Sequence, residues 1–128
     1  MNKINMSISA VCGGFVTYWL GGFDSMLALL CAMAVIDYVS GVTAAAFTGT
    51  LSSRIGFAGI IKKVCMFLVV ACANILSGHT NLPIREMTIF FYVANEGLSF
   101  LENIGNVTQL PDFLKGVLLS MKEEKSDE

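Results

Sequence analysis

Charged residues are scarce in this sequence. They make up 14% of its 128 residues, whereas roughly a quarter is usual in soluble domains, and apolar residues make up 55%. A chain this short has too much surface for its volume to hide so much apolar material in one water-facing globule. The formal net charge of −2 provides no general attraction to nucleic acid, so nucleic acid is excluded as an expected partner. The composition predicts a chain that needs a lipid bilayer or a large partner.

Motifs for catalysis and metal binding are also missing. The sequence contains no GxSxG, no HExxH and no phosphate-binding glycine loop. Histidine occurs once, at His79, in a stretch that we expect to be a loop. The four cysteines lie in apolar runs without a CxxC pair, where we expect them to act as small hydrophobes: Cys12, Cys31, Cys65 and Cys72. We therefore expect no catalytic residues, no cofactor, no metal site and no enzymatic activity.

Apolar runs dominate what is present. Residues 26–47 are long enough to span a bilayer, whereas residues 64–77 are short for a crossing and could borrow residues 59–61. The sequence predicts an all-α integral membrane protein with four transmembrane helices, and three helices plus an amphipathic one remain the alternative. The expected helices cover residues 8–23, 26–47, 64–77 and 85–106.

The two ends of the chain carry further signals. The first apolar run could alternatively be a secretory signal, but it lacks an Ala-x-Ala-like cleavage site. Met6 could serve as a second start that omits the cationic Lys3, or it is simply an internal methionine. We expect a tight turn at residues 21–24 and an amphipathic surface helix at residues 112–121. Residues 1–121 then form a single helical membrane domain, and residues 122–128 a charged, disordered cytoplasmic tail.

The basic residues predict the orientation. Residues 48–63 read as a loop that holds Arg54, Lys62 and Lys63 and no acidic residue. By the positive-inside rule, this loop lies in the cytoplasm. With four crossings, both termini would also be cytoplasmic, and the protein would be a multi-pass protein of the bacterial cytoplasmic membrane.

A polar strip follows the helix expected over residues 85–106. At 100° per residue, its polar side chains fall on one arc of roughly 120°, while the rest of the circumference is apolar apart from Glu86 at the very start. Such a face is costly in lipid unless it meets other polar helices or lines water. The strip comprises Arg85, Thr88, Tyr92, Asn95, Glu96, Ser99, Glu102, Asn103 and Asn106. We expect Asn95, Glu96, Ser99, Glu102 and Asn103 to form a polar pore or oligomer face.

Asp37 lies near the middle of the run at residues 26–47. At the bilayer centre an aspartate costs about 2.5–3.5 kcal/mol on the insertion scale, which the apolar residues of this run roughly offset. Asp37 also begins a series of small residues spaced by four, Gly41, Ala45 and Gly49. We expect its carboxylate to face a helix interface and to be the partner of the polar strip. If the helix boundaries differ, Asp37 could instead reach the headgroups.

These residues also form an ordered pattern along the chain. Its parts are Asp37 and Gly41, the GTLSS segment at 49–53, Gly56, Gly59, Lys62-Lys63, Phe91-Tyr92, Asn95-Glu96-Gly-Leu-Ser99, Glu102-Asn103, Pro111 and Leu114. Over about residues 26–118 the chain resembles the phage-lysis and toxin-secretion holin family, the group that includes the clostridial toxin-export holin. The resemblance implies homo-oligomers that open lesions in the bacterial cytoplasmic membrane, without necessarily touching the endolysin or large toxin that leaves. It implies no catalytic residues.

Two other functions fit a small helical membrane protein. In a four-helix proton-coupled multidrug transporter, Asp37 or Glu96 would bind cations and protons alternately. The polar residues are spread along a whole helix rather than focused on one site, which favours the holin. The third possibility is a structural subunit of a larger membrane complex.

Overall fold

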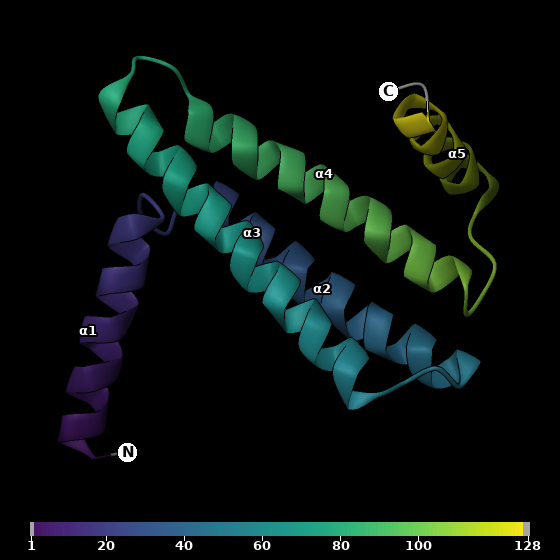
Figure 1. Ribbon diagram of the computed structural model, residues 1–128, viewed down its shortest axis with the longest axis horizontal. Helices are drawn as coiled ribbons and strands as arrows, with labels where there is room; N and C mark the ends of the chain where they lie inside the picture. Colours follow the sequence, from purple (N-terminus) through teal and green to yellow (C-terminus); the bar gives the residue numbers. More distant parts are fainter. Residues whose placement is uncertain (1, 127–128) are drawn as a thin grey trace.

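Three long helices packed side by side form the centre of the molecule (Figure 1). The computed structural model describes residues 2–126, with the backbone alone at Lys125. In this part of the chain it contains α1 (Lys3–Trp19), α2 (Ser25–Thr48), α3 (Ser53–His79), α4 (Ile84–Gly105) and α5 (Asp112–Ser126). Helices α2, α3 and α4 alternate in direction, whereas α1 diverges from one end of this bundle and α5 lies near the other. The all-α fold is confirmed.

Local caps determine where α2 and α3 begin and end. The Asp24 carboxylate accepts a hydrogen bond from the Leu27 N–H at 2.9 Å, and the Ser52 hydroxyl accepts one from the Ile55 N–H at 3.2 Å. Gly49 ends α2 in the left-handed conformation, with φ of 75°. The loop expected over residues 48–63 is therefore wrong from Ser53 onward. The loop is shorter than expected because the Ser52 cap, and not the change in hydropathy near residue 64, determines where α3 begins.

Two glycines allow the first turns of α3 to lie against α2. A Cβ built on Gly59 would lie 3.2 Å from the Tyr38 ring, and one on Gly56 would lie 3.4 Å from the Tyr38 hydroxyl. That hydroxyl donates a hydrogen bond to the Gly56 carbonyl oxygen at 3.2 Å. Both glycines fall in the loop expected over residues 48–63, but in the structure they permit close packing inside a helix.

Other boundaries differ less from the expectation. The turn after α1 is confirmed, and Gly21 and Gly22 give it positive φ angles of 86° and 99°. His79 is the last residue of α3 rather than a loop residue. Helix α5 continues to Ser126, into the segment expected to be a disordered tail, and residues 127–128 lie outside the described part.

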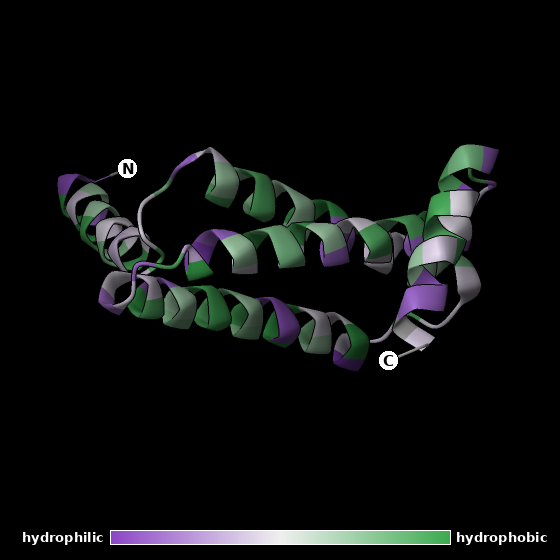
Figure 2. Ribbon diagram, turned by 90° about the horizontal axis from the view of Figure 1, so that it is seen from above, coloured by the Kyte–Doolittle hydropathy of each residue, from purple (hydrophilic) through white to green (hydrophobic). Residues whose placement is uncertain are grey.

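Helices α2 and α3 are long and apolar enough to cross a membrane. In α3, only 11% of the most apolar 18-residue stretch is buried inside the molecule. A core helix of a soluble protein with this composition would be mostly covered, so α3 needs lipid around it. Figure 2 shows apolar residues along most of the exposed length of the bundle. The structure is that of a helical membrane protein.

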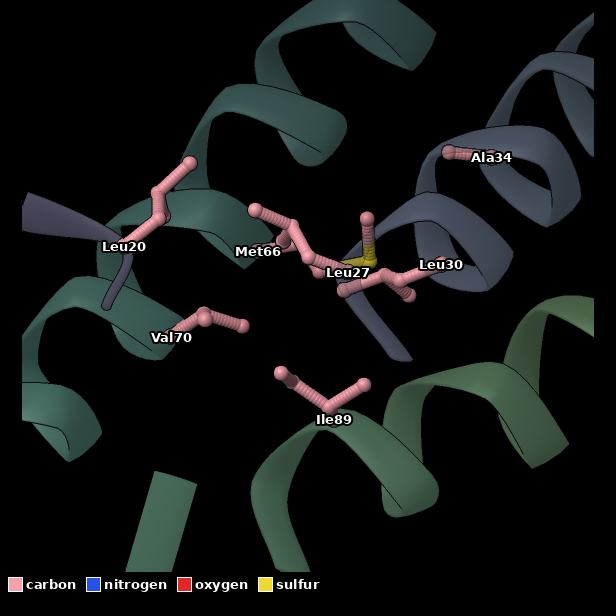
Figure 3. Close-up of a cluster of buried hydrophobic side chains, with 7 residues drawn as sticks. All are labelled: Leu20, Leu27, Leu30, Ala34, Met66, Val70 and Ile89. Atoms are coloured by element: carbon pink, nitrogen blue, oxygen red, sulfur yellow. The ribbon is translucent and has the colours of Figure 1, made fainter. Parts of the chain in front are cut away.

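The apolar core lies at the end of the bundle next to the α1–α2 turn (Figure 3). Leu27 and Leu30 of α2, Val70 of α3 and Ile89 of α4 are at most 1% exposed. Leu20, Ala34 and Met66 complete this cluster. In contrast, α1 buries none of its residues. The bundle proper therefore consists of α2, α3 and α4.

Candidate functional site

Three charged side chains meet inside the bundle, one from each of its helices. The Lys63 ammonium from α3 donates hydrogen bonds to Asp37 Oδ2 from α2 and to Glu96 Oε2 from α4. The exposed fractions of these side chains are 19% for Lys63, 11% for Asp37 and 7% for Glu96. We call these three residues the ion cluster. Charges this well covered persist only when they are paired and hydrogen-bonded.

Asn103, two helical turns after Glu96 on α4, extends the ion cluster. Its side-chain amide donates to Asp37 Oδ1 at 3.1 Å, to the Asp37 carbonyl oxygen at 3.2 Å and to Ser40 Oγ at 3.0 Å. A Cβ on Gly41 would lie 3.4 Å from the Asn103 amide nitrogen, so this glycine lets α4 approach α2 closely. The Asn103 side chain of α4 thus packs against the start of the small-residue series, at Asp37 and Gly41.

A groove of about 400 Å³ reaches the ion cluster from the N-terminal end of α3. Asp37, Lys63, Ser99 and Asn103 contribute its polar lining. Its apolar and small residues come from α2 and α3: Tyr38, Gly41, Val42, Ile55, Gly56, Ala58 and Gly59. This volume admits water next to the Asp37 carboxylate. Among residues 2–126, no group of three His, Cys, Asp or Glu side chains could hold a metal ion.

The polar strip is divided in the structure. Glu96, Ser99 and Asn103 face α2 and α3, and Asp37 lies opposite them, so these four predicted residues come together. Glu102 is exposed and pairs with Lys122 of α5 at 3.6 Å. Asn95 is half-buried on α4. The strip is therefore covered largely within one chain.

The main residue that sequence reasoning missed is Lys63. We assigned it to a cytoplasmic loop with Arg54 and Lys62, which are indeed exposed near the N-terminal end of α3. Lys63 instead points into the bundle. The available signal was Asp37 itself, because a carboxylate in an apolar run requires a cation, and Lys63 immediately precedes the next apolar run.

A second charged cluster closes the opposite end of the bundle. Arg85 of α4 is 4% exposed and binds both oxygens of Asp24, at 2.8 and 3.2 Å. Its guanidinium also donates to the carbonyl oxygens of Leu20 at 2.6 Å and Gly22 at 3.1 Å. We call this the arginine clasp. It ties the α1–α2 turn to α4, a role that the polar strip alone did not predict.

Gly21 is required by this clasp. A Cβ at this position would collide with Asn74 Oδ1 and would lie 2.5 Å from Arg85 Nε. The Asn74 amide donates to the Trp19 carbonyl oxygen at 3.0 Å, so α3 also holds the turn. The carbonyl groups of the turn are thus paired with side chains of α3 and α4.

The arginine clasp predicts a pH dependence of stability. The hydrogen bond from Arg85, and then that from the Leu27 N–H, lower the pKa of Asp24 from its usual 3.8 to about 2. A carboxyl with a depressed folded-state pKa contributes stability above its unfolded pKa and loses that contribution as the pH falls through the folded value. The midpoint of detergent-induced unfolding should therefore decrease between about pH 4 and pH 2.

The matched variant for this measurement is Asp24→Asn. Asparagine caps a helix as well as aspartate does, so α2 keeps its N-cap. The variant should be less stable at neutral pH, because Arg85 loses its counter-charge, and its stability should change little over the same acid range. An equally steep loss in both proteins would assign the dependence to another group.

Comparisons with known proteins agree with this architecture. The model of the bacteriophage holin family matches residues 14–123. A probable holin of Bacillus phage phi105 is 35% identical over 91 residues, which are 70% of this chain and 67% of that protein. An uncharacterized protein of Listeria innocua is 37% identical over 121 residues, covering 91% of this chain and 85% of its own. No solved structure matches the chain.

The apolar, exposed helices and the charges buried between them define a helical membrane protein whose polar groups meet inside the bundle. The chain belongs to the bacteriophage holin family. This membership supports a holin role, and the family consists of non-enzymatic, pore-forming membrane proteins. The resemblance inferred from the sequence is confirmed.

Proposed function

We propose that this protein is a holin that oligomerises in the bacterial cytoplasmic membrane and opens lesions through which a phage endolysin or a toxin leaves the cell. The observation that carries this proposal is the placement of the α4 polar face. Glu96 and Asn103 are paired with Lys63 and Asp37 of the same chain, while the rest of the bundle surface is largely apolar. A single chain can therefore reside in lipid without exposing this face.

The mechanism that follows has two states. In the closed state, the polar face of α4 is satisfied by α2 and α3 of its own chain. In the assembled state, neighbouring copies and water would satisfy the same groups around a shared hole. A polar face in a membrane requires partners in both states, but it does not require the same partners. Lesion formation then amounts to an exchange of intramolecular for intermolecular pairing.

The proposed topology is multi-pass with both termini in the cytoplasm. Arg54 and Lys62 lie at the end of the bundle where α3 begins and α4 ends, and α5 with Lys115 and Lys122 lies near that end. The positive-inside rule places this end in the cytoplasm. Helices α2, α3 and α4 would then cross the membrane. A crossing by α1, which has 17 residues, would return Lys3 to the same side.

Co-expression with an endolysin tests this function. The double variant Glu96→Leu with Glu102→Leu should shift the onset of lysis substantially or abolish lysis, because it removes both carboxylates of the strip. Of the single variants, Glu96→Leu should cause most of the effect, since Glu96 is buried in the ion cluster and Glu102 is exposed. The measurements are culture turbidity and leakage of a membrane-impermeant dye, with protein levels matched by immunoblot.

Unchanged lysis onset and dye leakage in the double variant would contradict the role of the strip. Expression of the wild-type chain also separates holin from transporter. A holin kills the host at a set time when the lytic enzyme is present, whereas a proton-coupled multidrug transporter would confer resistance. One observation favours the transporter, namely the groove that leads to the buried Asp37 carboxylate and to Lys63, which also binds Glu96.

A further inference from the structure

The formal charges of the ion cluster do not balance. Two carboxylates, Asp37 and Glu96, share one ammonium, Lys63, and all three side chains are largely buried. The other charged residue at the groove is Lys62, which is exposed and forms no ion pair with either carboxylate. The remaining polar groups that face the cluster, Ser99 and Asn103, are neutral. If both carboxylates were ionised, the bundle would enclose one uncompensated negative charge.

We propose that the closed bundle is a proton-binding site, in which Glu96 carries one proton and shares it with Asp37. Both carboxylates accept a hydrogen bond from the same Lys63 ammonium, which brings them close together. A hydrogen bond between two carboxyl groups requires a proton on one of them. Two negative charges this close together, on side chains that are largely buried, strongly disfavour ionisation of both carboxyl groups. With one proton bound, the cluster has Asp37 and Lys63 as an ion pair and a net charge of zero.

The hydrogen bonds indicate which carboxyl holds the proton. Asp37 accepts from Lys63 at Oδ2 and from Asn103 at Oδ1, so both of its oxygens already receive donors, as a carboxylate requires. Glu96 accepts from Lys63 at Oε2. Its Oε1 is the position at which a proton can be added and donated toward Asp37. Glu96 is also the less exposed of the two side chains, at 7% against 11%.

The groove provides the route to this site. Asp37 and Lys63 line it together with Gly56 and Lys62 near the N-terminal end of α3, so water can reach the cluster from that end of the bundle. The proton comes from this water and returns to it, and no other reactant is needed. The site exists in the closed, single-chain bundle and therefore does not depend on whether the protein opens lesions.

Labelling with dicyclohexylcarbodiimide tests the site, because this reagent reacts with protonated carboxyl groups in apolar surroundings. Membrane vesicles that contain the full chain would be treated at neutral pH, and the modified residue located by peptide mass spectrometry. We expect labelling at Glu96 and none at the exposed Glu102. Labelling of Asp37 in place of Glu96, or of neither residue, would overturn the proposal.

The decisive variant is Asp37→Asn. It removes one negative charge, so Lys63 and an ionised Glu96 balance without a proton. Labelling of Glu96 should then fall about tenfold or more at neutral pH. Asp112→Asn, which removes an exposed carboxylate at the start of α5, should leave the labelling unchanged. If Asp37 had only a structural role, its replacement would loosen the bundle and increase the access of the reagent to Glu96. Labelling of Glu96 would then rise rather than fall.

If Asp37→Asn fails to accumulate in the membrane, the wild-type pH profile takes its place. Labelling of Glu96 should persist at pH values at which exposed carboxyl groups of the same chain are ionised and unreactive. Loss of Glu96 labelling in parallel with those groups as the pH rises would overturn the proposal.

Discussion

Replacing Lys63 by methionine is expected to destabilise the closed bundle by about 3 kcal/mol, because removing one partner of a buried charge group leaves the others uncompensated. Methionine preserves most of the side-chain volume, so the effect reports the lost ammonium rather than a cavity. The midpoint of unfolding in mixed micelles of increasing dodecyl sulfate content, followed by far-ultraviolet circular dichroism, measures this change.

Lys62→Met is the matched control. It removes the same charge from the adjacent position of α3, but Lys62 is exposed and unpaired. Its effect on stability should remain within about 0.5 kcal/mol. Both variants change the positive charge near the N-terminal end of α3 equally, so any effect on membrane orientation should be shared. Equal destabilisation by the two substitutions would mean that the ion cluster contributes nothing specific.

Replacing Arg85 by methionine should produce a loss of similar size, about 3–5 kcal/mol. Five side-chain hydrogen bonds disappear, and the carbonyl groups of Leu20 and Gly22 lose their donor close to the apolar core. Arg85→Lys should recover only part of the loss, because an ammonium cannot reproduce the planar two-point contact with Asp24. The same unfolding titration applies.

Arg54→Met is the control for the arginine clasp, since Arg54 is exposed in the first turn of α3. We expect little change in stability from it. Full recovery of stability by Arg85→Lys would indicate that Arg85 acts only as a charge, and the bonds to the turn would then be of minor importance.

The sequence predicted those parts of the fold that depend on periodicity. The polar strip on α4, its partner Asp37 and the glycine turn before α2 follow from residue spacing, and the structure brings Asp37 together with Glu96 and Asn103. These features are local or lie on single helices. A helical repeat assigns side chains to faces without knowledge of the neighbours.

The predictions that failed concern pairing between helices. A lysine next to an apolar run has the same signature whether it marks a water-facing loop or a buried counter-ion, so hydropathy placed Lys63 outside the bundle. Arg85 was assigned to the polar strip correctly, but its partners in the α1–α2 turn lie more than 60 residues away in sequence. Periodicity shows that a polar face needs a partner, and it does not show whether that partner belongs to the same chain.

Helix α1 contributes no side chain to the apolar core, and its connection to the rest of the molecule is made at the turn that Arg85 and Asn74 hold. In the proposed topology, in which α1 crosses the membrane, its residues are constrained by lipid rather than by neighbouring side chains. At exposed positions such as Ile8 and Val11, any residue of comparable hydropathy could replace the present one. Asp37, Lys63 and Arg85 have specific partners, so another residue type would leave those partners unpaired. Natural variation can accumulate in the first helix at little cost, and the bundle behind it tolerates far less.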